Sequence, residues 1–164
     1  AMSRRHEVDL TERLCERLRD RGGITRAGGY GGWVRFLFDR AGGGVFTFDL
    51  KYFHGSGGAS PVTKGLIANN RMLTQFDADI YFEGHNHHRN QDRAVRHCLT
   101  ARSLEIRRKE ILMLRGGSYK DDYADGYGGF AVEKRMGPRP IGGWLLRFYW
   151  RRDMGILVEP RDIL

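Results

Sequence analysis

The chain has 164 residues, of which 40% are hydrophobic, and this length and composition predict one domain over residues 1–164 with a single core. Its 28 lysines and arginines exceed its 20 acidic residues, and the net charge of +8 favours partners that carry phosphate groups. No run approaches the ~20 apolar residues of a membrane-spanning helix, so we expect neither such a helix nor a membrane as a partner. Cys15 and Cys98 show no pairing pattern, so we expect a reduced, cytoplasmic protein.

The first predicted elements are a helix and a β-hairpin. Asp9-Leu10-Thr11-Glu12 has the spacing of a helix N-terminus, and leucines recur at helical intervals as far as Leu18. We expect this amphipathic helix to pack through its leucines. The runs 33–38 and 45–53 have strand-like composition and are joined by Gly42-Gly43-Gly44, which predicts a hairpin.

A helix and further strands are expected after the hairpin. They are a helix from Ser60-Pro61 to about Gln75, a short buried strand at 79–83, and strand-like runs at 93–100, 105–114, 142–150 and 155–159. The tyrosine-rich segment 119–127 fits either a short helix or a surface lid. This order of elements indicates an α/β fold.

Histidines follow the ends of two of these strands. His54-Gly55 ends the hairpin's second strand, and Gly84-His85-Asn86-His87-His88 follows the short buried strand. In an extended segment, His85 and His87 would project from the same side. Imidazole is the commonest neutral metal ligand and suits manganese, iron, zinc or nickel. The two strand ends therefore predict a convergent metal site, against the alternative of a polar, histidine-rich turn.

These motifs resemble the C-terminal half of the calcineurin-like metallophosphoesterases, in the manner of phage and prophage members. The resemblance covers roughly residues 45–90, where a strand ending in His-Gly is followed by a helix and by a strand entering Gly-His-x-His. It extends more loosely through Gly116-Gly117-Ser118-Tyr119 to the strand at Gly142-Gly143-Trp144. The resemblance implies a partial metallophosphoesterase-type β-sandwich flanked by helices, formed by the C-terminal portion of such a domain.

The resemblance also implies a set of metal ligands and a reaction. By motif, His54 and His85 would bind one divalent cation and His87 its neighbour, whereas His88 matches no ligand position. The implied activity is that of a phosphatase or phosphodiesterase, in which a metal-bound hydroxide attacks phosphorus in line without a covalent intermediate. The substrate would be a phosphoester.

Several motifs of the family have no counterpart in this sequence. Asp-x-His, Gly-Asp and Gly-Asn-His are absent, and Arg5-His6-Glu7 lacks the Gly-Asn that would make it the last of them. We therefore expect an incomplete dinuclear site with slow or absent turnover, and either a missing N-terminal half or a homo-oligomer that covers exposed strand edges. Asp49 and Asp79 would be the first carboxylates to test as further ligands.

Two alternatives remain beside the phosphoesterase. One is a basic nucleic-acid-binding module on the same fold without catalysis, and the other is a mononuclear metal site that only stabilises the fold. The candidate phosphate-binding or nucleic-acid-binding residues are Arg89, Arg102, Arg107, Arg108 and Lys109. Such cations often decorate only a solvated strand face. The aromatic residues of 144–150 are expected to form core rather than a base-stacking platform.

Overall fold

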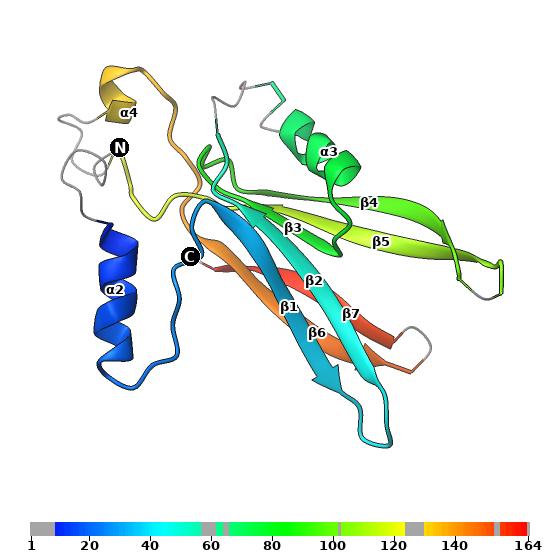
Figure 1. Ribbon diagram of the computed structural model, residues 1–164. Helices are drawn as coiled ribbons and strands as arrows, with labels where there is room; N and C mark the ends of the chain where they lie inside the picture. The colour runs from blue at the N-terminus through cyan, green and yellow to red at the C-terminus, as the bar shows by residue number, and fades with distance from the viewer. Residues whose placement is uncertain are drawn as a thin grey trace. The chain divides into compact units, whose positions relative to one another are not determined.

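The computed structural model describes residues 9–56, 62–63, 66–101, 103–123, 130–152 and 155–163 (Figure 1). We expected one domain over the whole chain. The chain divides into two compact units, Ala1–Gly32 and Trp33–Leu164, and each is described by itself. Together the described residues form a mixed α/β fold, as the order of elements predicted.

The first unit contains helix α2 (Leu10–Arg19). The Asp9 carboxylate accepts hydrogen bonds from the backbone N–H groups of Thr11 (2.9 Å) and Glu12 (3.2 Å), which confirms the predicted N-terminus. The expected packing through leucines is not found for Leu14 and Leu18, whose exposed fractions are 57% and 41%. Leu14 and Leu18 are therefore available for contact with another molecule.

A five-stranded sheet organises the second unit. Its strands are β1 (Gly31–Asp39), β2 (Val45–Phe53), β3 (Ile80–Glu83), β4 (Asn90–Leu99) and β5 (Ile106–Arg115), in the order β1-β2-β3-β5-β4. β3 pairs in parallel with β2 and β5, whereas β4 and β5 are antiparallel. The predicted hairpin is confirmed, and the glycines at 42–44 all take positive φ angles of 98–100° that favour glycine.

A separate antiparallel pair of strands and two helices complete the second unit. They are β6 (Gly143–Arg151), β7 (Gly155–Ile163), α3 (Leu66–Gln75) and α4 (Phe130–Glu133). Strand β7 is longer than predicted. The predicted helix start at Ser60-Pro61 lies outside the described residues, as does the part of the 119–127 segment from residue 124 onwards.

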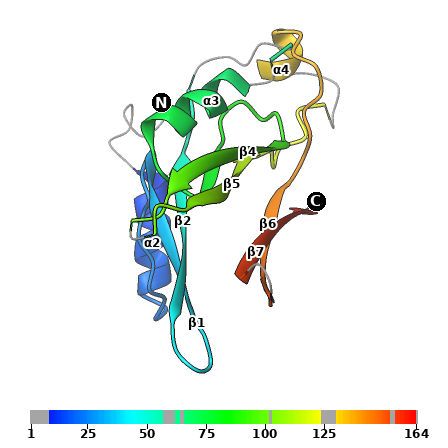
Figure 2. The ribbon, with the colours of Figure 1, turned by 90° about the vertical axis from the view of Figure 1, so that its right-hand side faces the viewer.

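Strand β5 separates two apolar cores because its side chains alternate between the faces of the sheet. Ile111 and Met113 pack with Met72 of α3 on one face. Leu112 and Leu114 pack on the other face, where the partners include Trp144 of β6. Figure 2 accordingly shows α3 and the β6–β7 pair on opposite sides of β5. The parallel strands β3 and β5 are thus covered on both faces, as parallel strands require.

Candidate functional site

The two predicted strand ends meet. Phe53 and Glu83 are register partners at the ends of parallel strands β2 and β3, and Gly84 N–H donates to the Phe53 carbonyl at 3.2 Å. His54 and His85 lie in the loops that leave these two strands. Their imidazoles are in contact, because His85 Nδ1 lies 3.2 Å from His54 Nε2. The ring centroids are 5.1 Å apart. The sequence predicted that His54, His85 and His87 come together, and of these three His54 and His85 converge.

Glycine is required immediately after His54. Gly55 has a φ of 88°, and a Cβ placed there would lie 2.9 Å from the Gly84 carbonyl oxygen and 3.0 Å from Glu83 Cγ. The loops leaving β2 and β3 therefore pass too closely for any side chain at this position. The His-Gly pattern has a steric cause that is independent of any ligand.

The loop after β3 is not extended, which corrects the expectation about side-chain direction. His85 and His87 both take left-handed backbone conformations, with φ angles of 68° and 54°. Strand alternation therefore does not place their imidazoles on one side. Within the described ranges, no group of three or more His, Cys, Asp or Glu residues is arranged to hold a metal ion, so His87 does not complete the pair. His88 instead contacts Arg139, with Nη1 and Nδ1 2.9 Å apart.

A buried ion pair lies directly behind the histidine pair. Arg115 of β5 is fully buried, and its Nη2 lies 2.5 Å from Oε2 of its register partner Glu83. Burial raises the pKa of Glu83, while electrostatic interactions with Arg115 and then His85 oppose that rise. Burial likewise lowers the pKa of Arg115, against the attraction of Glu83. Neither Glu83 nor Arg115 was among the site residues predicted from the sequence, although each is a charged residue that ends an apolar strand run.

The geometry of the histidine pair fits two ligands of one cation. Two nitrogen ligands each ~2.1 Å from a metal stand ~3.0 Å apart in octahedral and ~3.4 Å apart in tetrahedral coordination. The observed separation of 3.2 Å between His54 Nε2 and His85 Nδ1 lies between these values. The pair would supply two of the four ligands of a tetrahedral cation.

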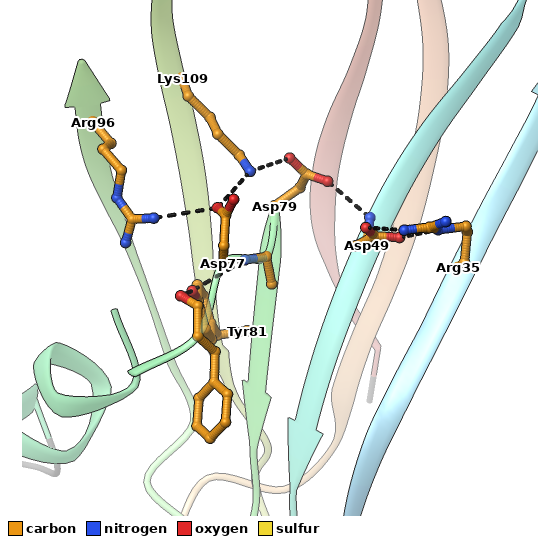
Figure 3. A network of polar contacts seen from close by, with 9 residues as sticks. Arg35, Asp49, Asp77, Asp79, Tyr81, Arg96 and Lys109 are labelled. Carbon is orange, nitrogen blue, oxygen red and sulfur yellow. Dashed lines mark hydrogen bonds and ion pairs between the residues drawn. The ribbon is translucent and has the colours of Figure 1, made fainter. Parts of the chain in front are cut away.

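Asp49 and Asp79, which were named as possible further ligands, belong to a polar network away from the histidine pair. Figure 3 shows a polar network that crosses the five strands at the opposite end of β3. It runs through Arg35, Asp49, Asp79, Lys109, Asp77 and Arg96. Asp79 precedes β3 and accepts a 2.8 Å hydrogen bond from Asp49 N–H, while the histidine loop follows β3. Four strand residues span ~13 Å, so Asp49 and Asp79 lie too far away to share a cation with His54.

The predicted phosphate-binding cations are not gathered in one place. Arg89 donates to the Ile141 carbonyl at 2.8 Å and lies 3.6 Å from Asp162. Its role in the structure is to join the loop before β4 to β6 and β7.

Three other candidate cations lie together on β5. Burial disfavours the charge of Lys109, but its hydrogen bonds to Asp77 and Asp79 outweigh that effect and raise its pKa. Arg107 and Arg108 are exposed. Arg102 lies outside the described residues.

Comparisons of this chain with protein-family models, with curated protein sequences and with solved structures each returned no match. In the part of the chain that the structure describes, no helix is long and apolar enough to cross a membrane.

Proposed function

We propose that this protein is a metal-dependent phosphoesterase, built on a partial sandwich of the calcineurin-like metallophosphoesterase type, that hydrolyses phosphomonoesters or phosphodiesters. The observation that carries the proposal is the contact between His54 and His85, whose ring nitrogens lie 3.2 Å apart where two parallel strands end. The carboxyl ends of parallel strands are a common location for ligand sites in α/β sheets. The free thiols of Cys15 and Cys98 suit a reducing compartment, and we include the cytoplasm in the proposal.

In this proposal, His54 and His85 hold a divalent cation, with manganese, iron, zinc and nickel all suited to imidazole ligands. The cation would polarise a phosphoryl oxygen as a Lewis acid. Glu83 lies behind the pair, and the Arg115 guanidinium offsets the charge of its carboxylate. The exposed His87 would hold a second cation on the same loop.

The residues around the histidine pair also predict how fast a phosphoester would be hydrolysed. Two cations held close together need a bridging carboxylate to offset their charge. Among the described residues no carboxylate joins His54 and His85 in a group that could hold a metal ion, and Glu83 behind them is paired with Arg115. We therefore expect slow turnover of a chromogenic phosphodiester in the presence of manganese.

Metal binding is the first test. Titration calorimetry with Mn²⁺ or Zn²⁺ should show binding to the wild-type chain and its loss in His54→Ala and in His85→Ala. His97→Ala is the matched control, because His97 is an exposed histidine on β4, away from the ends of β2 and β3 where His54 and His85 meet. Unchanged binding in both site variants would remove the basis of the proposal.

Turnover separates catalysis from a purely stabilising metal. Here His87→Ala should slow hydrolysis of the phosphodiester while the first cation still binds. A chain that binds metal through His54 and His85 but shows no metal-dependent hydrolysis would instead contain a structural mononuclear site.

A further inference from the structure

A groove of about 500 Å³ lies between the five-stranded sheet and β7, at the end of β3 away from the histidine pair. One wall comes from β2 and the first half of β5, and the other comes from the residues 155–159 of β7. Arg108 shares a face of β5 with Leu112, which packs toward β6 and β7, because side chains two residues apart in a strand lie on the same face. The arginine therefore faces the groove rather than α3.

The ion pairs of the groove leave a surplus of positive charge. Each acidic residue of its lining already has a cationic partner. The pairs are Asp79 with Lys109, Glu110 with Arg93, and Glu159 with Arg161. Arg107 and Arg108 also line the groove, and no hydrogen bond or ion pair engages either of them among the described residues. By the same alternation Arg107 lies on the other face of β5, so Arg108 is the guanidinium group that the groove presents to an anionic partner.

An aromatic pocket of about 260 Å³ adjoins the groove. The two hollows share Phe46, Tyr149 and Ile156 in their linings, so they form one continuous surface. Trp150 is 45% exposed, and the Arg40 guanidinium lies 4.9 Å from the centre of its ring. The aromatic residues of β6 were expected to form core, and Trp144 does so, but Trp150 keeps nearly half of its surface open.

We propose that this surface, formed by the groove at Arg108 and the pocket at Trp150, binds single-stranded nucleic acid. Guanidinium groups bind backbone phosphates, and exposed aromatic rings stack on bases, which is the combination that single-strand-binding proteins use. A duplex keeps its bases stacked on one another and presents no base face to Trp150. The proposal does not depend on the histidine pair, which lies at the other end of β3.

Fluorescence anisotropy with labelled ten-nucleotide dT and rU oligonucleotides tests this proposal, in EDTA so that any metal-dependent activity is silent. Arg108→Ala should weaken binding several-fold and reduce the slope of log affinity against log salt by about 1. Arg71→Ala is its matched control, because Arg71 is an exposed arginine on α3, across the sheet.

A second pair of variants tests the stacking half of the surface. Trp150→Ala should weaken binding about tenfold. Trp33→Ala is the control, because Trp33 is also about half exposed but contacts Phe76 on the α3 side. Circular dichroism confirms that each variant is folded.

The proposal is overturned by any of four results. They are no binding of either oligonucleotide at low salt, equal losses in Arg108→Ala and Arg71→Ala, no loss in Trp150→Ala, or equally tight binding of a poly-glutamate peptide. The dT and rU arms show whether DNA or RNA is preferred, and a blunt duplex of the same length should bind more weakly than either.

Discussion

Replacing Arg115 with methionine tests whether the buried ion pair holds the end of β3 and hence the histidine loop. Arg115 has no exposed surface, and Glu83 is 6% exposed. Arg115→Met keeps an apolar stem of similar length but leaves the Glu83 carboxylate buried without its partner. Because breaking a buried pair from one side leaves an uncompensated charge, we expect the free energy of unfolding to fall by about 3–5 kcal/mol at pH 7.

The double variant separates the pair from its two members. Glu83→Gln alone leaves the Arg115 charge uncompensated, so it should also be costly. In Glu83→Gln/Arg115→Met both side chains are neutral, and the loss should be well below the sum of the two single losses. We expect a coupling energy of about 2 kcal/mol or more, within the range for residues in direct contact.

The same pair predicts how the loss depends on pH. Burial raises the pKa of Glu83 above its ordinary value of 4.5, so the folded state holds this proton more tightly than the unfolded state. The contribution of the group to stability is full below pH 4.5 and is lost as the pH rises through the raised pKa. Removing the attraction of Arg115 raises that pKa further. The destabilisation by Arg115→Met should therefore be smaller in acid than at pH 7.

Urea unfolding followed by circular dichroism, with linear extrapolation at pH 7 and in mild acid, measures these quantities. A loss of less than about 1 kcal/mol for Arg115→Met at pH 7 would contradict the burial argument. Strict additivity in the double variant would show that the two side chains do not act as a pair.

Three further predictions concern the loop, the polar network and assembly. Because His87 has a φ of 54°, His87→Gly should be about 1 kcal/mol more stable than His87→Ala in urea, although both lack the imidazole; equal stabilities would contradict the left-handed conformation. The hydrogen bond from Arg35 lowers the pKa of Asp49 below its ordinary value of 3.8. The contribution of Asp49 to the stability of the fold is therefore full above pH 3.8 and is lost as the pH falls through the lowered pKa. Asp49→Asn should flatten the acid limb of the urea midpoint against pH, and an unchanged limb would argue against the pairing. We also expect light scattering to show a homodimer or larger oligomer. The double variant Leu14→Lys/Leu18→Lys should shift the protein toward the monomer. A wild-type protein that is monomeric at every concentration would refute this prediction.

The local elements of this protein follow from short stretches of its sequence. The start of α2 at Asp9, the hairpin at Gly42–Gly44 and the strands β2 and β6 all follow from patterns within a few residues, as do their approximate bounds. Such features depend on caps, turn geometry and side-chain alternation, which neighbouring residues specify. The convergence of His54 and His85 was also predictable, since parallel neighbouring strands end at the same edge of a sheet.

Which distant charges meet depends instead on how the strands are arranged in the sheet. Glu83 and Arg115 are 32 positions apart and become register partners because β5, not β4, lies next to β3. The same strand order brings Lys109 to Asp79 and leaves Arg108 unpaired in a groove. No local pattern encodes the order of strands in a sheet. That order is set by the packing of whole apolar faces, and it determines whether a charged side chain becomes a buried partner or an open site.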